Sequence, residues 1–286
     1  MYIAGDTILT SRVKSFSLKR PLLMGILNIT PDSFSDGGMF NHVDGMISRI
    51  EEFVSKGVDI ADIGGESTRP GSEFINADEE INRVVPAVKL ASESGLYVSV
   101  DTNKPEVAKA VLESGAGMIN DITGMRDEHM RKICAEYKCS VCIMHMQGAP
   151  KDMQANPVYV DVVEDVRRYL FEAAEQCIKD GIEESAICLD PGFGFGKSVE
   201  DNYRLLMKLE RFKESGFPVL AGISRKSMIG NVIGRPPVQR LAGTITAETI
   251  ALIKGADIIR AHDIDETADM ISVYMKAKEA GERCSN

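Results

Sequence analysis

The chain has 286 residues, 44% of them hydrophobic and 27% charged, which is the composition of a folded globular protein. Its 43 acidic and 33 basic residues give a net charge of −10, and a surface of that sign repels phosphate backbones and disfavours a nucleic-acid partner. Residues 1–20 lack the apolar core of a signal peptide, and no segment is long and apolar enough to span a membrane, so we expect a soluble cytoplasmic protein without a membrane partner.

Short apolar runs, each ending in polar residues, recur along the chain. They cover residues 22–30, 58–65, 97–102, 118–123, 141–146, 186–190, 218–224 and 258–263. The ends of neighbouring runs are separated by at least 21 residues (102 to 123) and at most 44 residues (146 to 190), which leaves room for a helix in every interval.

Helical signals fill these intervals. Residues 46–54 carry apolar side chains at helical spacing. Pro105 marks the start of another helix, and Ser198 with Asp201 forms a capping-box pattern before a further one. The longest predicted helix covers residues 160–179.

Alternating strands and helices predict an α/β fold, a parallel sheet closed into a (β/α)8 TIM barrel. We expect a single domain over residues 1–286, with the barrel core at about residues 22–280. An open doubly wound sheet shows the same alternation, but residues 28–31 (Asn-Ile-Thr-Pro) stand where its glycine-rich fingerprint would lie. The active site of a barrel lies at the carboxyl ends of its strands, where the polar clusters occur.

Two local patterns favour structural interpretations. Cys139 and Cys142 form a CxxC pair, but they open an apolar run and no second pair follows, so we expect both in the core. The segment from Gly192 to Ser198 resembles a phosphate loop, yet only three residues separate its outer glycines where a Walker A motif has four. We therefore exclude ATP binding, although glycines there permit a close ligand approach with Phe195 over a ring.

The strand ends collect carboxylates, amides and cations. Carboxylates and amides can pair with a flat, nitrogen-rich ring, and the cations can bind an anion, so we expect a pocket for a polar heterocycle that carries phosphate. Judged singly, His145 is compatible with a packed core histidine, Asp190 with a turn, and Arg260 and His262 with a surface ion pair. The set comprises Asn28, Glu66, Ser67, Thr68, Arg69, Asp101, Asn120, Asp121, His145, Asp190, Ser224, Arg225, Lys226, Arg260, His262 and Asp263.

Eight blocks carry a resemblance to a known family. They are residues 24–38, 62–71, 100–102, 120–122, 144–148, 190–197, 224–227 and 259–263. In this order they closely resemble the motifs of dihydropteroate synthases, over residues 22–274. The resemblance implies a barrel transferase of folate biosynthesis that joins hydroxymethyl-dihydropterin pyrophosphate to para-aminobenzoate and releases dihydropteroate and pyrophosphate.

The resemblance also implies roles for individual residues. Asp101, Asn120, Asp190 and Lys226 would line the pterin pocket, with Ile122, Met144 and Phe195 as apolar walls and Gly222 as a further contact. Arg260 and His262 would hold the pyrophosphate, and Asn28 would contact the Mg²⁺ cofactor that it carries. Phe34, Asp36, Thr68, Arg69 and Pro70 would close over the substrates, with Asp36 among the catalytic residues and Ser227 near the aminobenzoate. A homodimer is implied, as is a target for sulfonamides, which mimic para-aminobenzoate.

These residue types fit a dissociative substitution without a covalent enzyme intermediate. Mg²⁺, together with Arg260, His262 and Arg69, would neutralise the leaving pyrophosphate. Asp101 and Asp190 would stabilise the pterin cation, and the aromatic amine needs only placement. Two alternatives stay open: a pterin-dependent methyltransferase, which would not need the Arg260/His262 pair, and a noncatalytic pterin-binding paralogue.

Overall fold

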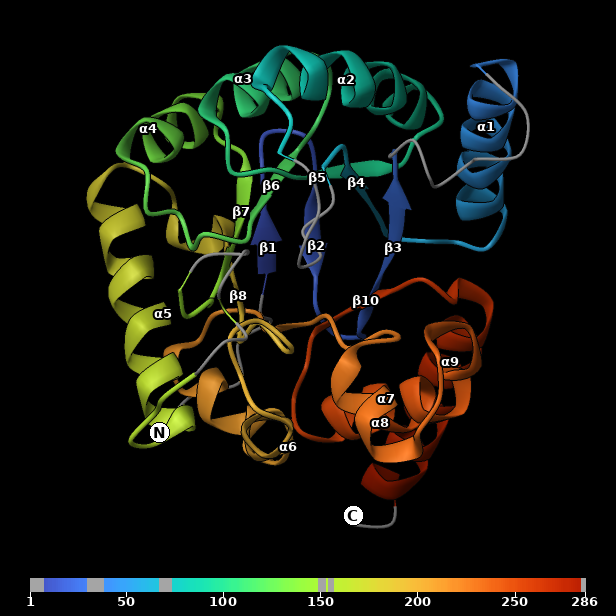
Figure 1. Cartoon of the computed structure of the whole chain (residues 1–286), viewed down its shortest axis with the longest axis vertical. Coiled ribbons are helices and arrows are strands. Elements are labelled where there is room, and N and C mark those ends of the chain that lie inside the picture. The colour runs from blue at the N-terminus through green and yellow to red at the C-terminus, as the bar shows by residue number, and fades with distance from the viewer. Residues whose placement is uncertain (1–7, 30–38, 67–73, 149–152, 154–156, 284–286) are drawn as a thin grey trace.

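A parallel eight-stranded sheet forms the centre of the computed structural model, which describes residues 8–29, 39–66, 74–148, 153 and 157–283 (Figure 1). Neighbouring strands follow the order β8-β7-β6-β5-β4-β3-β10-β9, and a parallel bridge between Leu189 and Val219 closes the sheet into a barrel. The predicted (β/α)8 barrel is confirmed, and each predicted run matches one strand, with β7 beginning one residue before its run. The strands are β3 (Leu22–Asn28), β4 (Ile60–Gly64), β5 (Tyr97–Asp101), β6 (Met118–Asp121), β7 (Ser140–Met144), β8 (Ile187–Asp190), β9 (Leu220–Ala221) and β10 (Ile258–Ala261).

Helices surround the barrel. In Figure 1, α2, α3 and α4 lie along one side, and α7, α8 and α9 lie on the opposite side. None of the helices in the described part of the chain has the length and apolar character needed to cross a bilayer. The helices are α1 (Met39–Ser55), α2 (Ala77–Glu93), α3 (Pro105–Glu113), α4 (Glu128–Tyr137), α5 (Val162–Lys179), α6 (Val199–Met207), α7 (Ser227–Ile233), α8 (Leu241–Ile253) and α9 (Ile264–Arg283), with short 3₁₀ turns η2 (Glu184–Ala186), η3 (Leu209–Ser215) and η4 (Pro237–Gln239).

Local chemistry sets the helix starts. The Ser198 hydroxyl accepts the Asp201 N–H over 3.1 Å, and the Asp201 carboxylate accepts the Ser198 N–H, so the predicted capping box begins α6. Pro105 is the first residue of α3, as predicted. Helix α5 begins two residues later than predicted because Asp161 is its N-cap and accepts the N–H groups of the first turn.

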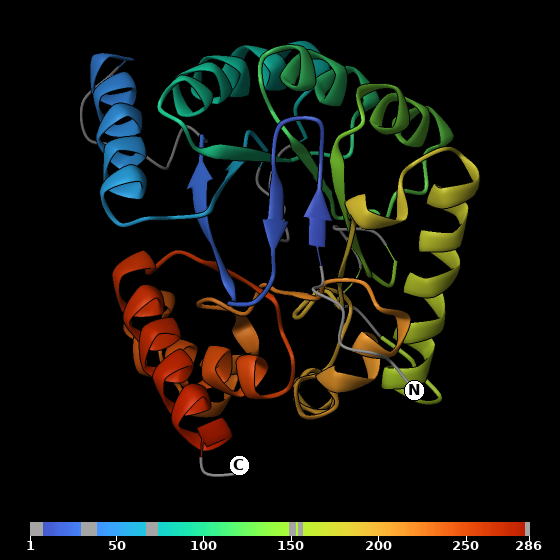
Figure 2. The ribbon, with the colours of Figure 1, turned by 180° about the vertical axis from the view of Figure 1, so that it is seen from behind.

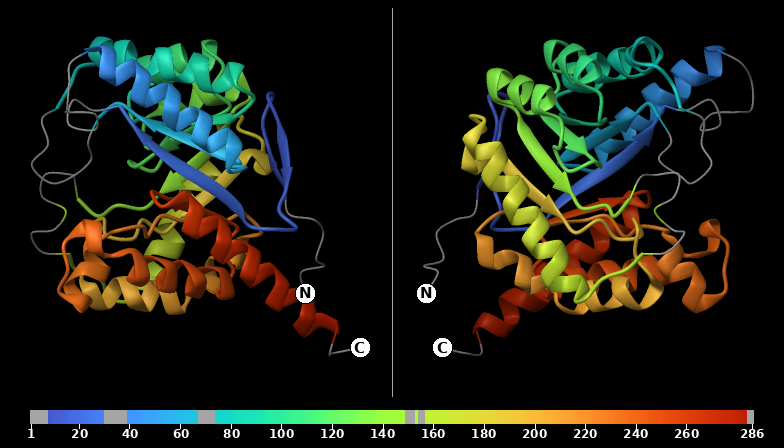
Figure 3. Two further views of the ribbon diagram at one scale, coloured as in Figure 1. Left: turned by 90° about the vertical axis from the view of Figure 1, so that its right-hand side faces the viewer. Right: turned by 60° about the vertical axis from the view of Figure 1, so that its left-hand side comes forward.

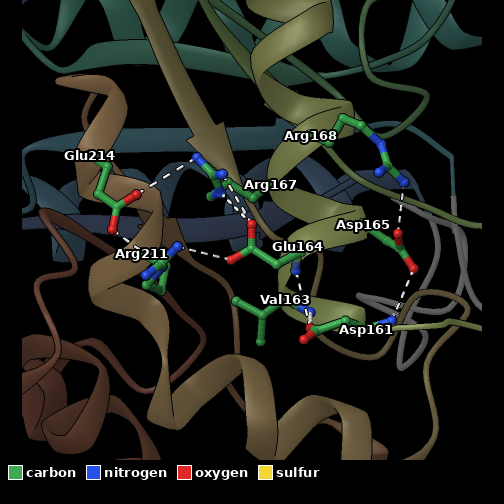
Figure 4. Close-up of polar contacts among 8 residues, drawn as sticks. All are labelled: Asp161, Val163, Glu164, Asp165, Arg167, Arg168, Arg211 and Glu214. Atoms are coloured by element: carbon green, nitrogen blue, oxygen red, sulfur yellow. Dashed lines mark hydrogen bonds and ion pairs between the residues drawn. The ribbon is translucent and has the colours of Figure 1, made fainter.

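A group of ion pairs ties α5 to η3 (Figure 4). Arg167 lies 3.0 Å from Glu164 and 3.7 Å from Glu214, and Arg211 lies 3.0 Å from Glu164 and 3.2 Å from Glu214. All four side chains are partly exposed, so each pair adds at most about 1 kcal/mol to folding. The closed ring instead fixes the orientation of η3 against α5.

A two-stranded hairpin closes the amino end of the barrel. Strands β1 (Ile8–Thr10) and β2 (Ser15–Ser17) pair antiparallel, and Figures 2 and 3 show this dark blue hairpin across one end of the barrel. Its buried Leu9 and Phe16 pack on apolar side chains inside the barrel, and the Phe16 ring meets Tyr97 edge to face at 5.0 Å. This hairpin is not apparent in the sequence, since two three-residue strands carry too little periodicity. With this end filled, polar side chains inside the barrel gather at the carboxyl end.

The cysteines lie in the core. Cys139 and Cys142 are both buried, as expected for the CxxC pair. The five cysteines within the described residues are free thiols.

Candidate active site

Successive side chains of a strand point alternately into and out of the barrel, and this alternation places the candidate residues inside it. In the paired strands Asp101 lies opposite Asn120, and Met144 opposite Asp190. On β10, Ala261 packs outward in the core between sheet and helices, so Arg260 on its neighbouring position points inward. The carboxyl end of the barrel thus carries a layer of polar side chains, and the amino end is filled by the apolar cluster that includes Leu9 and Phe16.

Arg260 is the centre of this layer. Its Nε donates to Oδ2 of Asp62 over 2.6 Å, and its Nη2 donates to Oδ2 of Asp101 over 3.2 Å. Nδ2 of Asn120 donates to the same Asp62 oxygen over 3.2 Å. Four strands, β4, β5, β6 and β10, are joined through this one guanidinium group and its carboxylates, and the surface ion pair considered for Arg260 is excluded.

Asp62 is a site residue that the sequence analysis missed. It is completely buried in the middle of β4, among Ile60, Ala61 and Ile63. A charged residue inside an apolar strand is itself a signal, because an unpaired carboxylate there would be costly. Oδ1 of Asp62 and Oδ1 of Asn120 are buried and have no hydrogen-bond partner among the described residues. Two acceptors without donors suit a ligand that carries N–H groups.

Burial and neighbouring charges shift the pKa values of the side chains in this layer. Burial raises the pKa of Asp101 to about 7, opposed by the charge of Arg260 and assisted by that of Asp62. Burial also raises the pKa of Asp190, against the opposing charge of Lys226. Burial lowers the pKa of Lys226 to about 8, while Asp190 acts in the other direction. For Arg260, burial lowers the pKa, but the two carboxylates outweigh it and leave the pKa raised, so the guanidinium stays charged.

Lys226 and Asp190 lie close enough for the charge of each to shift the pKa of the other, and both contact the segment that follows β8. The Lys226 ammonium donates to the Phe193 carbonyl and lies 4.5 Å from the centre of the Phe195 ring. The Gly192 N–H donates to Oδ1 of Asp190 over 2.7 Å. These contacts fix the Asp190 carboxylate and the Lys226 ammonium against the segment that follows β8.

An apolar cluster lies beside these charges. Ile122, Met144, Met146 and Met153 pack together, and the partly buried Phe195 packs against them. The structure thus brings together the three residues expected as pocket walls, Ile122, Met144 and Phe195. A Cβ on Gly222 would lie 3.8 Å from Arg260 and 3.9 Å from Asp190, so only a small residue leaves the space between them open.

His262 lies at the end of β10 beside Ser224. Its Nδ1 is 3.1 Å from the Ser224 hydroxyl, which also accepts the His262 N–H over 3.2 Å. Ser227 is the first residue of α7 and is exposed. Asn28 ends β3 and is partly exposed.

Other strand-end candidates have structural partners instead. Glu66 pairs with Lys104, and Arg225 pairs with Asp263. The Asp121 carboxylate accepts N–H groups of the turn that follows it, and His145 is buried against Lys197. The remaining candidates, Phe34, Asp36, Ser67, Thr68, Arg69 and Pro70, lie outside the described residues.

A closed parallel barrel with a layer of charged side chains at the carboxyl ends of its strands defines the class of TIM-barrel enzymes. Within that class the chain belongs to the pterin binding enzyme family, whose model matches residues 24–262.

Relatives with known names agree with this membership. Dihydropteroate synthase of Haemophilus influenzae is 44% identical over 268 residues, covering 93% of this chain and 98% of the relative. The Escherichia coli K12 enzyme of the same name is 44% identical over 269 residues, covering 93% and 95%. The Yersinia pestis dihydropteroate synthase solved with a sulfonamide drug complex superposes with a TM-score of 0.90 at 41% identity, covering 95% and 99%. The Burkholderia cenocepacia enzyme complexed with 7,8-dihydropteroate gives 0.88 at 41%, covering 97% and 98%.

Proposed function

We propose that this chain is a dihydropteroate synthase, a transferase of folate biosynthesis that joins hydroxymethyl-dihydropterin pyrophosphate to para-aminobenzoate. The observation that carries the proposal is the buried layer in which Arg260 bridges Asp62 and Asp101 opposite Asp190 and Lys226. Its support from relatives is specific, because solved dihydropteroate synthases of this fold were captured with 4-aminobenzoic acid and with 7,8-dihydropteroate.

The pocket suits a pterin ring. A pterin edge presents several N–H donors, and Asp101, Asn120 and Asp190 offer the acceptors for them. Lys226 donates to the ring oxygen, and the flat face packs on Met144 and Phe195. The partnerless Oδ1 atom of Asn120 is one of the acceptors that a bound ring would satisfy.

The reaction needs charge stabilisation more than proton transfer. As the C–O bond at the pterin methylene breaks, the pyrophosphate leaves with the electron pair, and Arg260 and His262 stabilise its negative charge. The carboxylates of Asp101 and Asp190 favour the pterin cation that remains. The lone pair of the amine then forms the C–N bond, and the nitrogen releases a proton to solvent. No enzyme nucleophile takes part in this sequence.

Mg²⁺ fits the residues present as a companion of the pyrophosphate. Within the described part of the chain, no group of three or more His, Cys, Asp or Glu could hold a metal alone. The Asn28 amide oxygen at the end of β3 is a hard ligand, and Mg²⁺ is often held by one or two side chains together with phosphate oxygens and waters. When bound, the ion would neutralise charge on the leaving group, with Asn28 as its protein ligand.

We also propose a homodimer, a cytoplasmic location and sensitivity to sulfonamides. The dimer is supported by exposed apolar side chains on the neighbouring helices α7, α8 and α9, namely Val232, Ile253 and Val273. Sulfonamide binding is supported by the drug complex of the Yersinia pestis relative.

The proposal is tested by product formation. Purified protein is mixed with hydroxymethyl-dihydropterin pyrophosphate, Mg²⁺ and para-aminobenzoate, and dihydropteroate is measured by mass spectrometry. We expect product from the wild type and a loss of about a hundredfold in Asp190→Asn, which keeps the shape but removes the charge. A wild type that binds pterin without forming product would contradict the proposal.

A further inference from the structure

Lys197 is a buried lysine for which the reaction has no direct use. Its side chain lies within the segment between β8 and α6, and the residue is only 3% exposed. Its Nζ donates to the carbonyls of Gly192 (2.9 Å), Phe195 (3.0 Å) and His145 (3.2 Å) and lies 3.0 Å from Nδ1 of His145. No described carboxylate forms an ion pair with it. Burial lowers the pKa of Lys197 to about 7, and the N–H groups of its amine face only backbone carbonyls and the His145 ring.

The sequence around Lys197 resembles a phosphate loop, but its geometry is the reverse of one. In a phosphate loop the lysine reaches outward to the ligand. Here the ammonium points into the protein and gathers carbonyl oxygens from two segments. Those oxygens would repel one another at close range without a shared donor, so the lysine is the group that permits their convergence.

His145 completes the arrangement. Burial, together with the neighbouring Lys197 charge, lowers the pKa of His145 to about 2, so the imidazole is neutral and carries one bare nitrogen. Because Nδ1 faces an ammonium, it acts as the acceptor and Nε2 carries the proton. The residue that follows β7 is thereby linked to the segment that follows β8.

The two segments are packed too closely for side chains to intervene. A Cβ on Gly192 would lie 2.0 Å from the His145 carbonyl oxygen, and one on Gly196 would lie 2.6 Å from the Gln147 carbonyl oxygen. Both glycines have positive φ, +69° and +61°. Only glycine allows this approach, which brings the carbonyls within reach of one ammonium.

The segment that Lys197 fixes carries the pterin contacts of the proposed site. Gly192 anchors Asp190 through its N–H, the Phe193 carbonyl accepts from Lys226, and the Phe195 ring lies beneath the Lys226 ammonium. A shift of this segment would therefore displace Asp190, Lys226 and Phe195 together. The Arg260 guanidinium on β10 instead donates to Asp62 and Asp101.

We propose that Lys197 is a positioning residue of the pterin pocket, which sets the places of Asp190, Phe195 and Lys226 by binding the backbone between β8 and α6 to the end of β7. This inference rests on the proposed function. It predicts a selective effect on the pterin substrate, whereas a lysine that only stabilised the fold would affect both substrates alike.

The test compares Lys197→Met with Lys213→Met. Methionine keeps the length of the side chain without donors, and Lys213 is a control that bridges η3 to Asp257 over 2.6 Å, away from the pocket. Affinity for 6-hydroxymethylpterin is measured by titration calorimetry, and KM for each substrate by pyrophosphate release. We expect Lys197→Met to weaken pterin binding and raise the pterin KM at least about tenfold, with the para-aminobenzoate KM changed less than about twofold.

Other outcomes decide against the inference. Unchanged pterin affinity in Lys197→Met, or equal increases in both KM values, would overturn it. If Lys197→Met does not yield folded protein, Lys197→Gln retains two N–H donors, and we expect a loss of pterin affinity of about threefold, with unchanged affinity again overturning the inference. Because calorimetry needs no turnover, and wild-type product formation tests the enzyme separately, failure of the proposed function would be seen apart from failure of this inference.

Discussion

Asp62→Asn separates the charge of the buried carboxylate from its shape. Asparagine keeps one oxygen acceptor for Asn120, but Arg260 loses the negative charge 2.6 Å from its Nε and retains only Asp101 at 3.2 Å. A hydrogen bond between buried charged groups contributes about 1.5–3 kcal/mol, so we expect a loss of about 2 kcal/mol in the free energy of unfolding. For a domain of this size that corresponds to a fall of about 3 °C in the melting temperature.

The same substitution should also shift the pH dependence of kcat/KM toward lower pH. The charge of Asp62 raises the pKa of Asp101, and Arg260 lowers it. Replacing the Asp62 carboxylate therefore lowers the pKa of Asp101 for two reasons. The negative charge of Asp62 no longer repels that of Asp101, and Asp101 becomes the one carboxylate that pairs with Arg260. The ionised Asp101 is the active form, so the acid limb of kcat/KM, which reports the free enzyme, moves to lower pH by about one unit.

The assay is amine-dependent pyrophosphate release between pH 5 and 9, with unfolding by urea measured in parallel. Asp257→Asn is the matched control, because Asp257 is also largely buried and pairs with Lys213 but lies at the amino end of β10. We expect the control to lower stability and leave the acid limb in place. An acid limb in Asp62→Asn that stays fixed or moves to higher pH would refute the reasoning.

Three further predictions follow from the described residues. Arg260→Met removes the charge shared by Asp62 and Asp101, and we expect kcat/KM for the pterin substrate to fall by about a hundredfold or more, measured in the same assay. Asn28→Ala removes the proposed Mg²⁺ ligand, and the Mg²⁺ concentration for half-maximal activity should rise about tenfold, with no change contradicting that role. Glu248, completely buried beside Thr267, has a pKa raised to about 8 by burial, so its folded state binds a proton that the unfolded state loses above about pH 4.5. The free energy of unfolding should therefore fall as the pH rises from about 4.5 to about 8. Glu248→Gln should remove this pH dependence and raise the free energy of unfolding at pH 8 by on the order of 2 kcal/mol, measured by urea unfolding.

The barrel was predictable because its signals are local. Each strand is a short apolar run that ends in a polar cluster, and the capping box of Ser198 and the start at Pro105 depend on residues a few positions apart. The hairpin of Leu9 and Phe16 was not predictable, since its strands are short and its burial depends on the barrel end that it covers.

The site was predictable only in part, because strand-end residues do not reveal where they point. Arg225 and Lys226 are neighbours, yet Arg225, at φ 57°, turns to Asp263 while Lys226 turns to the pocket. Asp62 was missed since its partner Arg260 lies 198 residues away in sequence and meets it only in the register of the closed sheet. The direction of Lys197 likewise depends on the His145 carbonyl, which follows another strand.

The central claim is tested most directly by measuring pyrophosphate and dihydropteroate in one reaction, with and without para-aminobenzoate. The account predicts that pyrophosphate release depends on the amine, and that the two products appear in a one-to-one ratio without an enzyme-bound pterin adduct after an acid quench. Release that is independent of the amine, or a covalent pterin adduct on the protein, would contradict it.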